Sequence, residues 1–196
     1  MKGYYLLNSF FDSSYVDRII EKVPDDSDAW EKGTIRGPDN EGQTDTSVRN
    51  VDLAHIGNLR NADLCRDLMY VASQVNAQYF GYDIYDIVQM DLLKYTGGLA
   101  DGEDQFYDWH VDTNFWGKGS ESHIHRKITM ILQLSDGSDY EGGDLEFKDN
   151  TIKEGHDFRA KGTVILFPAP WSHRITPVTK GLRRSLVAWV EGPAWR

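Results

Sequence analysis

The chain has 196 residues, 40% of them hydrophobic and 27% charged, which suits one globular domain with its own core. Its net charge of −10 disfavours binding to nucleic acid and to anionic membranes, because both carry negative phosphates. No apolar run is long enough to cross a bilayer, and the first residues lack a signal-peptide pattern. Cys65 is the single cysteine, so an internal disulfide is impossible and we expect a cytoplasmic protein.

The first elements expected along the chain are a strand and a helix. Residues 4–7 form a short apolar, aromatic run that indicates a strand. Asp12 or Ser13 can cap the helix that follows, and Pro24 stops it. Residues 33–50 are rich in Gly, Asp, Asn and Thr, and this composition predicts a polar, mobile loop.

The next segment, residues 60–80, has apolar side chains at helical spacing and predicts an amphipathic helix that ends at Gly81. Beyond Gly81 the pattern changes to short β-prone runs separated by turns. The predicted strands are residues 83–95, 126–134, 144–148, 163–167 and 183–190. The turns between them contain Gly97-Gly98, Asp136-Gly137, Gly142-Gly143, Pro168–Pro170 and Lys180-Gly181. Helices followed by many short strands favour one β-sandwich or barrel with helices packed outside it.

The segment Trp109-His110-Val111-Asp112 carries the first candidate chemistry. Residues two apart in a strand face the same way, so His110 and Asp112 would point together towards the core, with Val111 opposite. A third ligand must come from a remote strand, and His173, which follows an apolar run, is the best candidate. Two histidines and one carboxylate on one face of an octahedral metal leave three positions open, as non-haem Fe(II) oxygenases require.

The His-x-Asp pattern is common by chance, and other histidines compete with it. His123 and His125 also have metal-ligand spacing, but they lie in a Gly/Ser-rich polar segment that favours a solvated loop. His55 and His156 have no convergent partner and receive no role. The cluster therefore needs independent support.

That support comes from Arg183, ten residues after His173. The alternation in residues 183–190 predicts one strand face made of Arg183, Ser185, Val187 and Trp189. A hairpin with its turn at Lys180-Gly181 would bring Arg183 near His173 on the metal-facing side. A guanidinium can bind a carboxylate through two parallel hydrogen bonds, which suits the distal end of 2-oxoglutarate if its keto-acid end binds the metal.

Four segments together resemble one known family. They are LLKYTGG (92–98), YDWHVD (107–112), RKITMILQLSDGSDYEGGDLEF (126–147) and GTVILFPAPWSHRITPVTKGLRRSLVAWV (162–190). In this order they resemble the prolyl 4-hydroxylase-type branch of Fe(II)/2-oxoglutarate oxygenases, especially its compact bacterial and viral members. The resemblance implies one dioxygenase domain over residues 1–196. Its core, residues 83–192, would be a double-stranded β-helix (a cupin-like jelly roll), and residues 1–82 would supply α-helices packed on one sheet and the mobile loop.

The resemblance also implies roles for individual residues. His110, Asp112 and His173 match the metal triad of the family. Arg183 matches the basic residue that binds the distal carboxylate of 2-oxoglutarate, and Ser185 follows on the same face. Tyr95 matches a tyrosine that contacts this co-substrate near the metal. Gln133 departs from the pattern, because some relatives have a second such tyrosine there.

The reaction implied is hydroxylation of a C–H bond, with a prolyl residue in a peptide or protein as first choice. It would use Fe(II), 2-oxoglutarate and O2, with ascorbate as a candidate reductant. Trp189 matches an aromatic beside the target proline in some prolyl hydroxylases, although a core role is an equal alternative. Arg49, at the end of the polar loop, and Trp116, just after the His-x-Asp motif, are further candidates for substrate contacts.

Three other functions stay open at this stage. A metal hydrolase could use the same ligands for Zn²⁺, since two histidines and a carboxylate also hold that ion. A non-catalytic cupin-like binding module could keep the ligands for structure or sensing. A nucleic-acid demethylase of the same superfamily is disfavoured by the net charge of −10. The hydrolase leaves Arg183 unexplained, and the intact triad with Arg183 argues against the binding module.

Overall fold

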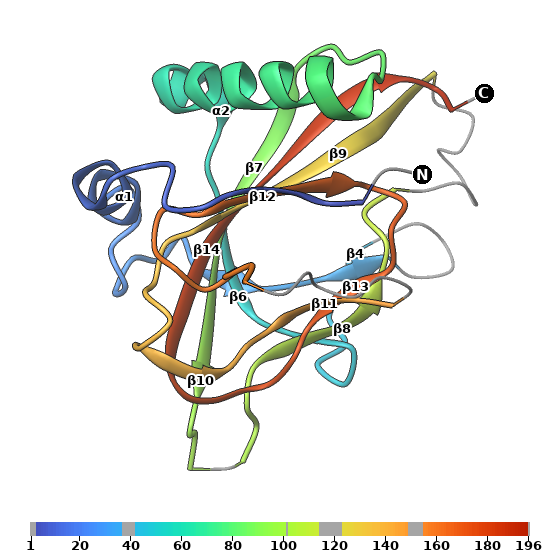
Figure 1. Ribbon diagram of the computed structural model, residues 1–196. Helices are drawn as coiled ribbons and strands as arrows, with labels where there is room; N and C mark the ends of the chain where they lie inside the picture. Colours follow the sequence, from blue (N-terminus) through green and yellow to red (C-terminus); the bar gives the residue numbers. More distant parts are fainter. Residues whose placement is uncertain (1–2, 37–41, 101, 114–122, 149–154, 196) are drawn as a thin grey trace.

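The structure of the chain is a computed structural model that describes residues 3–36, 42–100, 102–113, 123–148 and 155–195 (Figure 1). It is mostly β, with two antiparallel sheets that face each other and helices on the outer side of one of them. The jelly-roll fold with helices on one sheet, which the sequence resemblance implied, is confirmed. None of the described helices is long and apolar enough to span a bilayer.

The larger sheet supplies the floor on which the candidate site is built. Its order is β1 (Tyr5–Leu7), β12 (Val164–Pro168), β9 (Ile124–Gln133), β14 (Val178–Pro193), β7 (Ile87–Gly97), β6 (Asp52–His55) and β2 (Glu31–Lys32), with β10 (Tyr140–Gly142) also paired to β14. Every residue of β12 is buried, because this strand lies inside the sheet and is covered on both faces. This two-sided burial explains why the strand reads as a continuous apolar run, as the sequence indicated.

The smaller sheet lies opposite and is built from short strands. Its order is β11 (Leu145–Phe147), β13 (His173–Ile175), β8 (Phe106–His110) and β5 (Arg49–Asn50). A separate two-stranded ribbon is formed by β3 (Ile35–Arg36) and β4 (Gly42–Gln43). β1, β2, β5 and β6 all come from the first 82 residues, so this part of the chain supplies strands to both sheets as well as helices.

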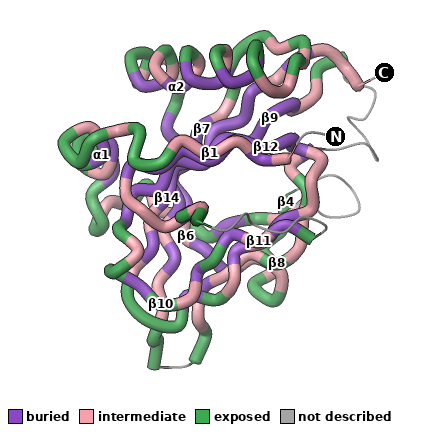
Figure 2. Tube along the Cα trace, viewed as in Figure 1, coloured by how far each residue is buried: buried purple, intermediate pink, exposed green. Residues whose placement is uncertain are grey.

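The helices cover the outer face of the larger sheet. α1 (Ser13–Ile20) begins where the carboxylate of Asp12 accepts a hydrogen bond from the Tyr15 backbone N–H at 2.8 Å. The short helix η1 (Asn58–Asn61) leads into α2 (Ala62–Val75), which continues as one π-helical turn, η2 (Asn76–Phe80). Gly81 then ends the helix in the left-handed conformation, as the sequence predicted. Figure 2 shows that α2 buries the side that faces the sheet and exposes the other.

Two apolar clusters lie on the two faces of the larger sheet. One packs the helices against the outer face, with Leu68 of α2 and Met90 of β7 among its buried members. The other fills the space between the sheets, with Leu93 of β7 and Ile175 of β13 among its buried members. The inner cluster surrounds the candidate site, so the site is held by packed side chains from both sheets.

The polar segment 33–50 is not entirely a loop. Its described part contains β3, β4 and β5, and β5 pairs with β8, with Arg49 opposite Tyr107 and Asn50 opposite Phe106. A two-residue strand has no period to detect, and its polar sequence hides it among turn residues. The pairing matters for function, because it fixes Arg49 beside the small sheet.

The turn predicted at Lys180-Gly181 is wrong, and so is the prediction that Arg183 begins a strand. β14 runs without a break from Val178 to Pro193, and Arg183 lies within it. Gly181 has φ +77° inside the strand, and a Cβ there would lie 2.1 Å from the Asp139 carbonyl oxygen. The glycine therefore permits the close approach of the backbone at Asp139 and Tyr140, where β10 begins. Thr176 and Pro177 lie between β13 and β14, and the chain continues there in one direction, because β13 pairs with β11 and the start of β14 pairs with β10 in the same sense.

Strand limits also differ from the predictions. β7 begins at Ile87 rather than at residue 83, and β9 begins at Ile124, so His125 lies in a strand and not in a loop. The short strands β2, β6 and β10 were not predicted, and β8 and β13 were expected only as the strands that carry His110 and His173, without bounds. Short or half-polar strands are the elements that single-sequence patterns identify least well.

Candidate metal centre

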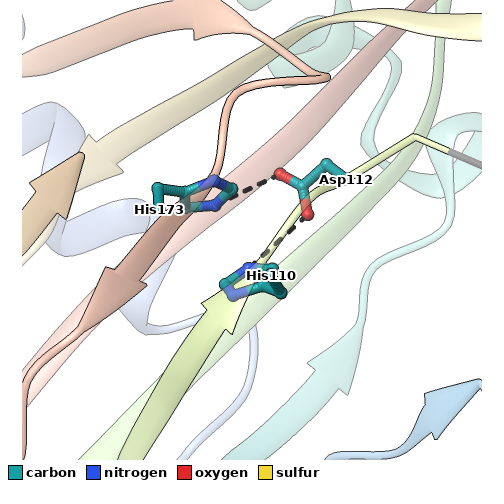
Figure 3. Close-up of side chains that lie close together, drawn as sticks. All are labelled: His110, Asp112 and His173. Carbon is teal, nitrogen blue, oxygen red and sulfur yellow. Dashed lines mark ion pairs between the residues drawn. The ribbon is translucent and has the colours of Figure 1, made fainter. Parts of the chain in front are cut away.

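His110, Asp112 and His173 meet at one end of the small sheet, as the sequence predicted. One ligand atom from each lies within 4.8 Å of the others (Figure 3). His110 and His173 are direct partners across β8 and β13, which places their rings side by side. The carboxylate of Asp112 faces both, with 3.7 Å from Oδ1 to His110 Nε2 and 3.5 Å from Oδ2 to His173 Nε2.

Asp112 is placed differently from the expectation of one continuous strand. β8 ends at His110, and Asp112 lies two residues beyond it. The alternation of faces still holds, because Val111 between them is 45% exposed. The backbone N–H of Asp112 donates to the Ala169 carbonyl at 2.9 Å, and the Thr129 hydroxyl donates to Asp112 Oδ2 at 2.7 Å. These two contacts hold the carboxylate where the strand no longer does.

Backbone carbonyls fix the proton on each imidazole. His110 Nδ1 lies 2.7 Å from the Asp108 carbonyl, and His173 Nδ1 lies 2.9 Å from the Trp171 carbonyl. A carbonyl only accepts, so each Nδ1 carries the hydrogen and each Nε2 presents a lone pair to the carboxylate. Two imidazole lone pairs and a carboxylate then converge with no donor between them. This donor set fits a divalent metal ion, whose histidine ligands are commonly oriented by such second hydrogen bonds.

The protonation states agree with that donor set. Burial lowers the pKa of His110 to about 3, and the neighbouring His173 adds to this effect. Burial alone would raise the pKa of Asp112, but His173, His110 and the Thr129 hydroxyl outweigh burial, so the pKa lies below its usual value. His110 is thus neutral and Asp112 ionised at neutral pH, which are the forms that bind metals.

Arg183 lies on β14 of the larger sheet, opposite the small sheet that carries the two histidines. It is 3% exposed, and its guanidinium donates to Ser185 Oγ at 3.2 Å and to Gln133 Oε1 at 3.0 Å. Its Nε is buried without a hydrogen-bond partner, and no described carboxylate forms an ion pair with it. Tyr95 stands beside it, with 5.3 Å between the guanidinium carbon and the ring centre. A buried cation without a counter-ion is costly, so this position suits an anionic ligand.

Gln133 turns its amide oxygen to Arg183 because its amide N–H₂ donates to the Tyr140 hydroxyl at 2.7 Å. The amide orientation is therefore set by a donor on one side and an acceptor on the other. Gln133 does not line the pocket that contains the metal cluster; it lines the neighbouring cavity, and Arg183 borders both.

One pocket between the sheets brings most of the predicted site residues together. It contains about 390 Å³ of unfilled space, its open mouth included. The predicted residues that line it are Arg49, Tyr95, His110, Asp112, His173, Arg183, Ser185 and Trp189. Trp116, a predicted substrate contact, lies outside the described residues.

Three residues of this region were missed in the sequence. Tyr107 stacks on His110 because the pairing of β8 with β13 is irregular, and simple alternation would place these two residues on opposite faces. Thr129 donates a hydrogen bond to Asp112, and the one hint in the sequence was its position as a polar residue within the apolar run 126–134. Arg126 lies over the ring of Trp189 at 4.0 Å from its centre. Its 3.4 Å hydrogen bond to the Asp112 carbonyl could not be predicted from the spacing in the sequence.

A jelly roll that holds two histidines, one carboxylate and an unpaired arginine in one pocket has the architecture of a non-haem iron oxygenase. The family model described as "2OG-Fe(II) oxygenase superfamily" matches residues 90–191, more than half of the chain. The chain belongs to this superfamily, whose members use Fe(II), 2-oxoglutarate and O2.

Several curated relatives are PKHD-type hydroxylases. That of Synechococcus sp. (strain CC9902) is 37% identical over 86 residues, which is 43% of this chain and 36% of the relative. That of Hyphomonas neptunium is 33% identical over 105 residues, which is 50% of this chain and 44% of the relative. The chain thus matches less than half the length of these relatives.

Solved structures share the fold over nearly the whole chain. A viral collagen prolyl hydroxylase from Paramecium Bursaria Chlorella virus-1, solved with 2-oxoglutarate, has a TM-score of 0.68 and 17% identity and covers 97% of each chain. A prolyl hydroxylase from Trichoplax adhaerens, in complex with a hypoxia inducible factor peptide, has a TM-score of 0.70 and 19% identity, covering 97% of this chain and 84% of that one. At such identities the likeness shows the fold alone.

Proposed function

We propose that this chain is a dioxygenase, dependent on Fe(II) and 2-oxoglutarate, that hydroxylates a prolyl residue in a peptide or protein, and that residues 1–196 form its single catalytic domain. The observation that carries the proposal is the buried guanidinium of Arg183 in the same pocket as the His-Asp-His cluster. A metal site alone fits many reactions. A metal site with an unpaired buried cation in the same pocket fits a co-substrate that is both a chelator and a dicarboxylate.

In this proposal His110, Asp112 and His173 hold the iron through two Nε2 atoms and one carboxylate oxygen. Iron bound there would supply the activation of O2 that couples decarboxylation of 2-oxoglutarate to succinate with oxidation of a substrate C–H bond. The chain supplies the geometry: the Asp108 and Trp171 carbonyls orient the two rings, as described above. Ascorbate, the candidate reductant, stays a prediction.

Arg183 would bind the distal carboxylate of 2-oxoglutarate, with Ser185 and Tyr95 beside it. Arg183 is oriented before the ligand arrives, because Gln133 accepts from one of its terminal nitrogens. Gln133 thus acts on the co-substrate through Arg183 and not by direct contact. Pre-ordered donors lose little entropy on binding, which favours affinity.

The substrate end of the pocket is assigned to Trp189 and Arg49. Trp189 is 6% exposed, and its indole N–H is buried without a hydrogen-bond partner among the described residues. Arg49 lies over Tyr107, 4.5 Å from the ring centre. An aromatic face and unpaired donors suit a prolyl ring with its adjacent peptide carbonyl. The names of the relatives and structural neighbours support the choice of proline, and Trp116 stays a predicted contact.

The alternatives explain less of the pocket. A metal hydrolase or a non-catalytic binding module needs the three ligands, but neither gives Arg183 an anion to bind. A nucleic-acid substrate conflicts with the net charge of −10. Membership of the oxygenase superfamily favours the dioxygenase over the hydrolase and the binding module.

Two experiments test the proposal. Metal-free protein is mixed without oxygen with Fe(II) and 2-oxoglutarate, and we expect a visible metal-to-ligand charge-transfer band. Absence of the band at saturating concentrations would refute the iron and co-substrate assignment. The substrate is then tested by mass spectrometry, with proline-containing peptides compared with the same peptides carrying alanine and with free amino acids. A gain of one oxygen on an amino acid other than proline would overturn the prolyl assignment while leaving the dioxygenase intact.

A further inference from the structure

A chain of polar side chains crosses the inner face of the larger sheet beside the pocket. Arg126 of β9 reaches over Trp189 of β14 and donates to Gln89 Oε1 on β7 at 2.8 Å. The Gln89 amide N–H₂ then donates to both carboxylate oxygens of Asp91, at 3.1 and 3.0 Å. Asp91 Oδ1 lies 2.6 Å from His55 Nδ1 on β6. These side chains come from neighbouring strands of the sheet, and the proposed function uses none of the hydrogen bonds that join them.

The register of the sheet explains how the arginine can reach that far. Trp189 is the direct partner of Gln89 on one side and of Thr129 on the other. Arg126 of β9 therefore reaches across β14 to Gln89 of β7, and its guanidinium covers the Trp189 ring at 4.0 Å from the centre. The guanidinium donates to Gln89 Oε1 at 2.8 Å and to the Asp112 carbonyl at 3.4 Å, and the shorter bond to Gln89 helps to keep it on that ring.

The partners leave Gln89 a single orientation. A guanidinium only donates and a carboxylate only accepts, so the amide oxygen must face Arg126 and the amide N–H₂ must face Asp91. Asp91 is 2% exposed, which makes it a buried acid in the middle of a sheet. Buried carboxylates are retained where they hold something in place, and here the group held is the Gln89 amide.

The linked side chains of Arg126, Gln89 and Asp91 act on Trp189. Its indole N–H is buried without a partner among the described residues, and its side chain lines the same pocket as His110 and Asp112. One face of the ring is covered by Arg126. A small rotation of the indole would move both the aromatic face and the unpaired donor relative to the metal cluster.

We propose that Asp91 and Gln89 are positioning residues which, through Arg126, hold the Trp189 indole in the orientation that receives the substrate. Neither residue lines the pocket or contacts the metal cluster. The part of the proposal that concerns substrate rests on the proposed function, whereas the part that concerns the indole does not. We expect loss of either residue to weaken substrate binding and to leave binding of 2-oxoglutarate unchanged.

The first experiment observes the indole directly and needs no substrate. The chain has six tryptophans, so a ¹⁵N–¹H spectrum of the indole groups is simple, and Trp189→Phe identifies the signal of Trp189. In Gln89→Met, which keeps the size of the side chain and removes the bridge, we expect that signal to shift or broaden while most others stay. The control is Val88→Ala, an exposed neighbour on β7, which should leave the Trp189 signal in place. An unchanged Trp189 signal in Gln89→Met overturns the proposal.

The second experiment separates geometry from charge at Asp91. Asp91→Asn can still accept from Gln89 through its oxygen and donate to His55 Nδ1 through its amide, so the Trp189 signal should stay near its original position. Asp91→Leu removes both acceptors and should give the spectrum of Gln89→Met. If Asp91→Leu does not fold, Gln89→Met and Asp91→Asn still decide the question. A Trp189 signal displaced equally by Asp91→Asn would show that charge, and not the hydrogen-bonded geometry, is required.

The third experiment measures catalysis with a proline-containing peptide that the wild-type protein hydroxylates. Gln89→Met should raise KM for the peptide by about tenfold, the effect of losing one well-placed contact, with a smaller change in kcat. The affinity for 2-oxoglutarate, read from the anaerobic band, should be unchanged. Equal weakening of peptide and co-substrate would overturn the positioning role. Absence of the band in the wild type would instead refute the proposed function, and the indole spectra would still decide whether Gln89 holds Trp189.

Discussion

Tyr107 lies flat on His110, with ring centres 3.4 Å apart and an angle of 9° between the planes. The guanidinium of Arg49 lies over the same Tyr107 ring, 4.5 Å from its centre. An imidazole whose proton is fixed by a carbonyl and whose plane is fixed by a stacked ring has little freedom left. We regard this stack as part of the metal site, although neither Tyr107 nor Arg49 is a proposed ligand.

Replacing Tyr107 by leucine should weaken metal binding. The change removes the stacked ring and leaves all three ligands, and loss of such supporting groups typically costs about 10–100-fold in metal affinity. Titration of metal-free protein with Co²⁺ measures the effect. Tyr85→Leu, at a tyrosine that is 61% exposed, is the control. Equal metal affinity in Tyr107→Leu and the wild type would show that the stack is only packing.

Replacing Arg183 by alanine should weaken 2-oxoglutarate binding by about 2–5 kcal/mol, the usual effect of removing one partner of a buried charge pair. The anaerobic charge-transfer band, titrated with 2-oxoglutarate, measures the loss. Arg184→Ala is a matched control, because Arg184 is the next residue and forms an ion pair with Asp25. Unchanged co-substrate affinity in Arg183→Ala would remove the central support for the proposed function.

Removing a proposed iron ligand should abolish succinate formation that depends on substrate. His110→Ala and Asp112→Ala each leave two ligands, which is too few for the proposed site. Succinate is measured with and without substrate, and Val111→Ala, between the two ligands and 45% exposed, serves as the control. Turnover retained in either ligand variant would refute the assignment of the cluster.

Lys127 gives a prediction on stability that is independent of the metal. The residue is 4% exposed, its Nζ lies 3.8 Å from the centre of the Trp195 ring, and burial lowers its pKa below 10.5, with Asp83 opposing the shift. Between the lowered pKa and 10.5 the unfolded chain holds a proton that the folded chain has lost. The unfolding free energy should therefore rise with pH in this window and be constant, for this group, below it.

Lys127→Met removes the titrating group and should remove that rise. Urea unfolding of both proteins, from neutral pH to about pH 10.5, measures the difference in stability between them. The unfolding free energy of the wild type should increase relative to that of Lys127→Met as the pH increases. A difference that does not change with pH would show that Lys127 titrates alike in the folded and unfolded chain.

The parts of the fold that the sequence predicted are those with strong local signals. Apolar runs such as 163–167 and the helical pattern of 60–80 depend on burial, which composition records directly. The grouping of His110, Asp112 and His173 followed from alternation and from the resemblance of several ordered segments. Arg183 was correctly placed in the same pocket, but for a partly wrong reason, because the expected turn at Lys180-Gly181 does not exist.

The errors have a common physical cause. A glycine with positive φ can end a strand or let another strand approach it closely, and Gly181 does the second. Tyr107 reaches the face of His110 only because the register of β8 is irregular, and register depends on the partner strand. The link from Arg126 to Gln89 joins residues 37 apart in sequence. These features depend on contacts between distant segments, which local patterns do not contain.

The two halves of the proposed co-substrate site belong to different layers. Both histidines are on the small sheet, while Arg183 and Ser185 are on β14 of the large sheet. A bound 2-oxoglutarate would therefore join the layers, as a removable crosslink does, and the packing between them would fix how long that link must be. We expect a dicarboxylate one carbon shorter to bridge the two layers less well. We therefore expect the distance between the sheets to select the length of the co-substrate. Core substitutions far from the metal would then change which dicarboxylate the protein accepts.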